Sequence, residues 1–502
     1  MRNCRFRSLC SLILGLALLT CGLARAQQTE EFRIQWDKPV VVSKSSATLQ
    51  IVVNPMTRPG SPMHDASFAA VKELGADYVR YVPWLPYPKL VVAELEPPTA
   101  ARTWWDFSLI DPMTKDFFDS TEGHTRILNF STIPAWMFKT EKPVSYPADP
   151  DKPVWDYTQG TELRDPTGKE LGEYFARLVS WYAKGGFTDE NGVRHDSGHH
   201  YAVPICEVLN EVDFEHNMTP QQYSERYDMI VEAIRKVSPE TKFMGMALAM
   251  PSRTPEYFEY FLNPKNHKAG IPLDYISYHF YASPPADQSI EHWQFSFFDQ
   301  ADGFLNTVRF AEAIRKRLSP ATKVDLDELG VILSDGIGNV DAQHPFKPYP
   351  ATYWNLAGAM YAYLYIELAK QQIDVVGESQ LIGYPTQFPS VTMVDWVTKK
   401  PNARFWVLKL MKDNFGPGDT LVTTQAPGEN GLAAQAFLTA RGKRLLLVNK
   451  RNRVLEVRLP AEAAGATALT VDEASGEGPA RTAKMDGGKL TMEPFAVTVV
   501  SW

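Results

Sequence analysis

The chain has 502 residues, of which 44% are apolar and 22% are charged, and its formal net charge is −8. This is the composition of a globular protein with enough apolar material for a large core, and the length predicts two to three domains. The acidic balance argues against nucleic acid and anionic membrane surfaces as partners. A strongly anionic substrate would need a local basic pocket.

Residues 1–26 have the pattern of a cleavable secretory signal. Three arginines in the first seven residues precede an apolar run at 9–19 that is too short to span a membrane, and an Ala-Arg-Ala cleavage site ends at Ala26. We therefore expect a secreted or periplasmic protein with no membrane association after cleavage. A lipoprotein anchored through Cys21 is the alternative, but Thr20 is larger than the residue normally found before a lipidated cysteine.

Cleavage would remove four arginines and no acidic residue, so the net charge would change from −8 to −12. Cys206 is the only cysteine after position 26, which excludes an internal disulfide in the mature chain. Because it lies in an apolar strand, we interpret it as a small buried hydrophobic residue.

Strands and helices alternate along most of the chain. Residues 27–49 contain strands that can join a later sheet. Eight apolar, β-branched segments then lie near positions 50, 79, 128, 206, 245, 277, 325 and 375. Amphipathic or apolar helices are expected at 67–74, 106–120, 169–184, 219–237, a short one from 254, 298–318, 353–372 and 402–413. Eight βα units in series predict a (β/α)8 TIM barrel over residues 50–415.

Two long segments interrupt this alternation. Residues 139–167 are rich in Pro, Asp and Tyr and predict a surface loop that walls one end of a cleft, which favours exo action. Residues 189–200 contain His195, His199 and His200, but we see no helix or fixed carboxylate partner there, so we expect no metal site.

The pattern changes after 416–418. Short alternating segments separated by turns rich in Gly and Asp predict a β-sandwich domain over residues 416–502.

Polar side chains follow the predicted barrel strands at their carboxyl ends, where TIM barrels carry their active sites. Asn210 and Glu211 end the fourth strand and Glu328 ends the seventh. An amide can hold a sugar hydroxyl, and a carboxyl group in an apolar mouth can keep its proton near neutral pH. Two carboxylates facing each other across a cleft are the equipment of glycoside hydrolysis.

Other acids compete with these two. Asp325 and Asp327 lie on the same strand as Glu328, and Glu207 is either a buried structural acid or a catalytic one. Glu378 is either a substrate contact or part of a strand-end ion pair.

The order of motifs resembles the retaining glycoside hydrolases of clan A, and within it family 39, the β-xylosidase and α-L-iduronidase family. Residues 207–213 (Glu-Val-Leu-Asn-Glu-Val-Asp) resemble the acid/base segment of that family, and 273–281 resemble its Asp-Phe-Ile-Ser-x-His-x-Tyr strand. Asp-Glu at 327–328 resembles the nucleophile strand. Two shorter matches are Pro-Ala-Trp at 134–136 and Pro-Asn-Ala at 401–403.

The sequence departs from the family pattern beside both acids. Leu209 and Val212 replace the usual Trp and Pro, and Leu329-Gly330 replaces Trp-Asn. The catalytic acids remain in place, while the neighbours that shape the sugar subsite differ.

The resemblance implies a double displacement. Glu211 would protonate the leaving oxygen and later deprotonate water, and Glu328 would be the nucleophile. Asn210 would hold the 2-hydroxyl, and Tyr281 or His279 would orient Glu328. Arg80 would support the same carboxylate, although His279 as a core histidine and Arg80 as a structural ion pair are open alternatives. The aromatic candidates for the cleft are Trp136, which we select, with Trp84, Trp293, Tyr384 and Trp396.

These residues predict a secreted retaining glycoside hydrolase that acts on a carbohydrate substrate without cofactor or metal. The sequence does not define an oligomeric state. A non-catalytic carbohydrate-binding protein on the same barrel is the alternative. A metal hydrolase using the three loop histidines or His279 lacks a clustered ligand motif.

Overall fold

The computed structural model describes residues 32–140, 145–154, 161–285, 287–333, 348–383, 388–426 and 431–502. The predicted signal 1–26, with Cys21, lies outside these residues. Part of the predicted 139–167 loop and Tyr384 lie outside them too. Among the described helices, none has the length and apolar character needed to cross a membrane.

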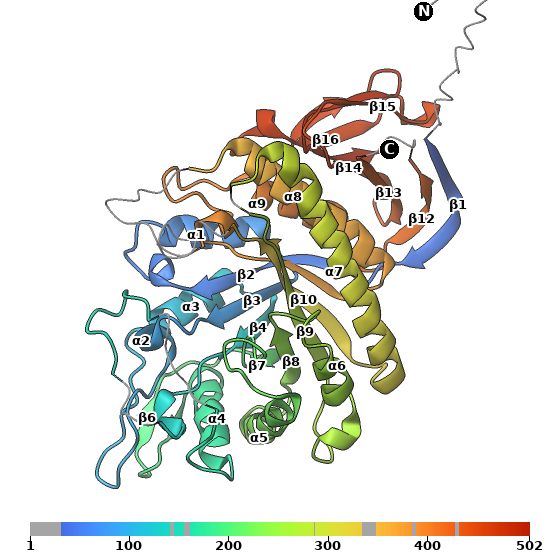
Figure 1. Cartoon of the computed structure of the whole chain (residues 1–502). Coiled ribbons are helices and arrows are strands. Elements are labelled where there is room, and N and C mark those ends of the chain that lie inside the picture. Colours follow the sequence, from blue (N-terminus) through green and yellow to red (C-terminus); the bar gives the residue numbers. More distant parts are fainter. Residues whose placement is uncertain are drawn as a thin grey trace, which may run out of the picture.

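A closed barrel of eight strands forms the centre of the molecule (Figure 1). Its strands are β2 (Ser46–Val53), β3 (Tyr78–Pro83), β4 (Thr125–Asn129), β7 (Ile205–Val208), β8 (Lys242–Leu248), β9 (Tyr275–Ala282), β10 (Lys323–Val331) and β11 (Val375–Glu378). Each strand pairs in parallel with the next, and β11 closes onto β2. The predicted TIM barrel is confirmed.

Helices pack around the barrel as the alternation predicts. They are α1 (His64–Leu74), the short α2 (Pro88–Val91), α3 (Ile110–Ser120), α4 (Lys169–Ala183), α5 (Pro220–Val237), α6 (Glu256–Phe261), α7 (Ile290–Leu318), α8 (Ala351–Lys370) and α9 (Ala403–Asn414). The capping box of Thr219 and Gln222, with Pro220 at the first helical position, fixes the start of α5. Helix α7 starts at Ile290, eight residues before the predicted 298. The prediction missed these residues because the first turns mix exposed and buried side chains and show no clear apolar face.

A second body of β-structure follows α9. Seven strands form one sheet in the order β1-β12-β13-β14-β19-β16-β17, and β15 pairs with β18. Their bounds are β1 Arg33–Val42, β12 Thr420–Gln425, β13 Leu432–Thr439, β14 Gly442–Asn449, β15 Leu455–Arg458, β16 Thr467–Val471, β17 Arg481–Lys484, β18 Lys489–Met492 and β19 Val497–Ser501. A separate apolar core joins residues of both sheets, including Leu445, Leu455 and Met492. The predicted C-terminal β-sandwich is therefore present.

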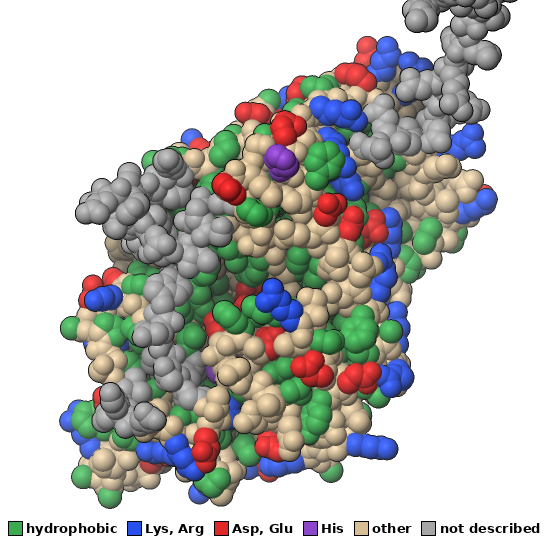
Figure 2. All heavy atoms as spheres, in the orientation of Figure 1, with side chains coloured by type: hydrophobic (Ala, Val, Ile, Leu, Met, Phe, Trp, Pro, Cys, Tyr) green, Lys and Arg blue, Asp and Glu red, His purple; other side chains and the backbone are tan. Residues whose placement is uncertain are grey.

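The first strand of the chain belongs to this C-terminal sheet. β1 pairs antiparallel with β12, and Figure 1 shows the blue strand beside the orange and red ones. The other face of the sheet packs on the barrel, where the rings of Phe415 and Phe437 lie 4.5 Å apart. Barrel and sheet thus share one apolar core. On the described part of the face in Figure 2, acidic and basic side chains are interspersed.

Candidate active site

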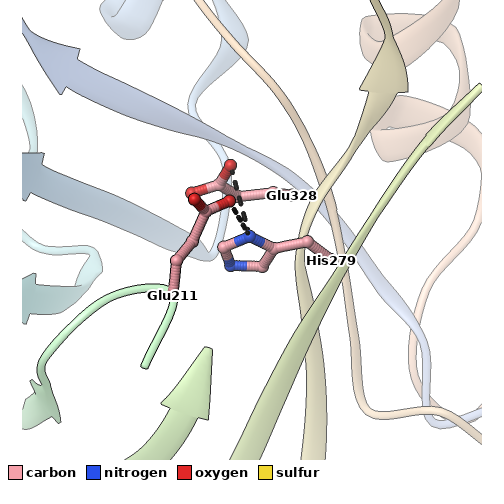
Figure 3. Close-up of side chains that lie close together, drawn as sticks. All are labelled: Glu211, His279 and Glu328. Atoms are coloured by element: carbon pink, nitrogen blue, oxygen red, sulfur yellow. Dashed lines mark hydrogen bonds and ion pairs between the residues drawn. The ribbon is translucent and has the colours of Figure 1, made fainter. Parts of the chain in front are cut away.

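The carboxylates of Glu211 and Glu328 face each other at the carboxyl ends of two barrel strands. Glu328 lies within β10, and Glu211 follows β7 by three residues. An oxygen of each and a ring nitrogen of His279 all lie within 4.8 Å of one another. Figure 3 shows the two carboxylates opposed, with the imidazole beside both.

Left-handed backbone positions Glu211. Leu209 and Glu211 have φ values of 65° and 44°, and Ala247 on β8 has φ 42°. The amide of Glu211 donates to the carbonyl of Ala247 at 2.9 Å. Such conformations cost a non-glycine residue roughly 1–3 kcal/mol each and persist where the surroundings hold them, which is common at active sites.

Arg80 on β3 contacts three acids. Its Nη1 donates to Glu328 Oε1 at 2.6 Å, and its Nε lies 2.6 Å from Glu207 Oε2 and 3.0 Å from Asp327 Oδ2. Its Nη2 donates to Asn210 Oδ1 at 2.7 Å. Arg80 is 1% exposed. Arg80 therefore has both of the roles that the sequence left open. It supports the Glu328 carboxylate, and it forms a buried structural ion-pair network with Glu207 and Asp327.

His279 and Tyr281 approach from β9. The Tyr281 hydroxyl donates to Glu328 Oε2 at 2.6 Å. His279 Nδ1 lies 3.1 Å from Glu211 Oε1 and 3.6 Å from Glu328 Oε2. Although burial favours the neutral ring, the charges of Glu328 and Asp327 raise the pKa of His279 well above its usual value. For the Glu211 carboxyl group, burial raises the pKa, and the charge of Glu328 raises it further.

The competing acids lie deeper in the barrel. Glu207 accepts from Asn129 at 2.7 Å as well as from Arg80, and burial raises its pKa to about 7. Asp327 lies between Arg80 and His279. Asp325 is 1% exposed and its carboxyl group makes no hydrogen bond among the described residues, and burial raises its pKa well above the usual range.

Glu378 and the aromatic candidates have their own partners. Glu378 forms a buried ion pair with Arg404 at 2.9 Å. Of its two interpretations, this contact agrees with the strand-end ion pair. The indole N–H of Trp136 donates to the carbonyl of Glu94 at 2.8 Å, and Arg164 stacks 4.3 Å from its ring centre. Trp293 packs on Phe297 and Tyr353, and Trp396 packs on the core.

Glu215 is a site residue that the sequence analysis missed. It accepts from the indole N–H of Trp84 at 2.8 Å and from Asn210 Nδ2 at 3.3 Å. Burial raises its pKa well above the usual value, and the charges of Glu211 and Glu328 add to the effect. Its spacing of four residues from Glu211 was the available signal, because one helical turn brings such residues together.

The loop histidines have carboxylate partners, contrary to expectation. His195 lies 2.8 Å from Asp189, and His199 lies 2.9 Å from Asp111. We expected a loop without fixed partners, but part of it forms β6 (Arg194–Asp196), which pairs with β5 (Gly186–Thr188). Among the described residues, the one group spaced to hold a metal ion is Glu211, His279 and Glu328.

A separate cavity of about 700 Å³ lies in the segment between β3 and α3. Its lining includes Lys89, Glu96, Arg102, Trp104, Trp105 and Asp106, and neither Glu211 nor Glu328 belongs to it.

Comparisons with known proteins give two family matches. Residues 200–322 match the family model of glycosyl hydrolases family 39, and residues 429–500 match the C-terminal immunoglobulin-like domain of D-apionate lactonase. No protein with a curated description matches the sequence.

Solved structures of glycoside hydrolases share the fold. One is a family 51 arabinofuranosidase from Xanthomonas axonopodis pv. citri, with TM-score 0.62 and 12% identity. A family 51 α-L-arabinofuranosidase from Bifidobacterium longum has TM-score 0.61 and 13% identity. A family 30 endoxylanase from Clostridium papyrosolvens C71 has TM-score 0.54 and 12% identity. Each alignment covers 94% of this chain and 99% of the other.

Proposed function

We propose that this glycoside hydrolase, which resembles family 39, cleaves O-glycosidic bonds of oligo- or polysaccharides by double displacement with retention of configuration. The observation that carries the proposal is the spacing of the two carboxylates, since one oxygen of Glu211 lies within 4.8 Å of one oxygen of Glu328. Retaining enzymes hold this pair about 5–5.5 Å apart, whereas inverting enzymes leave about 6.5–9.5 Å for a water molecule.

In the first step Glu328 attacks the anomeric carbon and Glu211 donates its proton to the leaving oxygen. The raised pKa of Glu211 favours the protonated form that this step needs. In the second step Glu211, now ionised, takes a proton from water, and the water displaces Glu328 from the sugar. The hydrogen bonds from Arg80 and Tyr281 hold the Glu328 carboxylate in a fixed orientation.

We also propose a β-xylosidase-like specificity and secretion after removal of residues 1–26. The family 39 match supports a pentoside as the first probe, and the structural neighbours named as arabinofuranosidases and an endoxylanase agree with that choice. Mass spectrometry of exported protein tests secretion: a mature chain should begin at Gln27.

The decisive experiment is intact-mass spectrometry after incubation with a panel of 2-deoxy-2-fluoro glycosyl fluorides. A covalent gain that maps to Glu328 and is absent from Glu328→Gln supports the double displacement and identifies the sugar. Asp325→Asn is the matched control. It changes an acid on the same strand whose side chain makes no hydrogen bond among the described residues, and this variant should still label.

Two results would reject the proposal. Binding of oligosaccharides without labelling by any sugar would indicate the non-catalytic carbohydrate-binding protein. Loss of hydrolysis on treatment with EDTA, restored by a divalent ion, would instead make Glu211, His279 and Glu328 metal ligands.

A further inference from the structure

A third carboxyl group lies beside the proposed catalytic pair, and the double displacement does not use it. The amides of Phe214 and Glu215 both donate to the carbonyl of Glu211, at 2.8 and 2.7 Å. This single turn brings the side chain of Glu215 over Asn210, whose amide donates to it at 3.3 Å. Glu215 is half-buried, so its side chain is partly open to a ligand.

The contacts of Glu215 leave capacity for a ligand. Its Oε1 accepts the indole N–H of Trp84 and its Oε2 accepts from Asn210. A carboxylate has about four lone-pair sites, and a carboxylic acid also has one O–H to donate. Because burial and the charges of Glu211 and Glu328 raise its pKa, the neutral acid is favoured, and this form both donates to and accepts from a hydroxyl group.

The charges around this position disfavour an anionic sugar. Among the residues that the structure describes, the basic side chains that contact the pair are those of Arg80 and His279, and both also contact other carboxylates or are shared between the two acids. Both are also 1% exposed. A sugar carboxylate entering here would face the carboxylate of Glu328 and would find neither cation free to pair with it. Like charges about 4 Å apart near a protein surface disfavour binding by roughly 100-fold or more.

We propose that Glu215 is a specificity-determining residue that hydrogen-bonds a ring hydroxyl of a neutral sugar, together with Asn210, and that the site rejects uronic acids because it holds the Glu328 carboxylate and no unpaired cation among the described residues. The inference rests on the proposed function and names the class of sugar that the same site accepts. Within the family resemblance it favours the xylosidase type of substrate over the iduronidase type.

The test compares two matched probes, an aryl xyloside and an aryl glucuronide, on wild type, Glu215→Gln and Glu215→Lys. Wild type should hydrolyse the xyloside and prefer it by at least roughly 100-fold in kcat/KM. Glu215→Gln should lose roughly 10- to 100-fold in kcat/KM on the xyloside, with a raised KM. Glu215→Lys should reduce the preference at least about tenfold, because a cation replaces an acid.

Glu190→Gln is the matched control. Glu190 also accepts an indole N–H, from Trp105 at 3.0 Å, but it lies outside the site, so its kinetics should equal those of wild type. Thermal unfolding of every variant separates misfolding from altered recognition.

The outcomes separate the two proposals. Failure of every fluorosugar to label Glu328 in the wild type overturns the proposed function. Normal labelling by a neutral sugar overturns this inference alone if Glu215→Gln keeps wild-type kcat/KM, or if the wild type accepts the glucuronide equally well.

Discussion

Replacing Tyr281 with phenylalanine removes one hydroxyl from the site and leaves the ring. That hydroxyl donates to Glu328 Oε2 at 2.6 Å. The other oxygen of Glu328 is held separately by Arg80, also at 2.6 Å. The substitution should therefore leave the carboxylate in place and remove one of its two strong hydrogen bonds.

The expected size follows from the charge on the acceptor. A hydrogen bond to a charged group contributes about 1.5–3 kcal/mol, and each 1.36 kcal/mol changes a rate tenfold. Because Glu328 must be oriented at the anomeric carbon, kcat should fall roughly 10- to 150-fold, with a smaller change in KM. Steady-state kinetics on an aryl xyloside and the rate of fluorosugar labelling both measure the effect.

Tyr278→Phe is the control on the same strand. The Tyr278 hydroxyl is buried and makes no hydrogen bond among the described residues, and its ring packs on Phe258 and Phe304. It should retain wild-type kinetics. A loss of less than about threefold in Tyr281→Phe would refute the assigned orienting role, since a bond of this strength cannot be silent.

Three further predictions test other parts of the argument. In the pH profile of kcat/KM, the alkaline limb should report Glu211, whose raised pKa keeps the active acid form to a higher pH; a limb that persists unchanged in Glu211→Gln would contradict this. Burial raises the pKa of Glu94 from 4.5 to about 8, so its contribution to stability is complete below pH 4.5 and is lost as the pH rises to about 8. Glu94→Gln should therefore be as stable as wild type at pH 4, and its free energy of unfolding should be about 1–3 kcal/mol higher than that of wild type at pH 8. If thermal melts show a difference that does not depend on pH, the titration of Glu94 is not its cause. Phe437→Ala should cost about 3–5 kcal/mol by opening a cavity at the contact with Phe415, with normal kcat for the folded protein, and a drop in kcat at low temperature would show that the sheet shapes the site.

The barrel could be predicted because its strands are short apolar runs separated by amphipathic helices. A strand gives no such signal in the sequence where almost none of its residues is buried. All four residues of β17 are exposed, so its segment carries no alternation, and β18 has one buried residue. Both strands form by pairing with neighbours that a local pattern cannot identify.

In the candidate site, too, the sequence indicates some features and only the fold determines others. The positions of Glu211 and Glu328 follow from strand ends, and the structure brings both together with Arg80, His279 and Tyr281. The partners of each side chain depend on the fold. The sequence could not show that Asn210 is held from both sides, by Arg80 and by Glu215.

The position of β1 has a consequence for how the chain assembles. β1 is the edge strand of the seven-stranded sheet. Its partner β12 is synthesised only after all the strands of the barrel. Until then β1 has no partner, and without β1 the edge of β12 would be open to pairing with other chains. In the finished sheet β1 is irregular and largely exposed, with register shifts around Pro39. Such an edge is a poor template for another strand. β1 therefore protects the seven-stranded sheet, most of which is synthesised last, from aggregation.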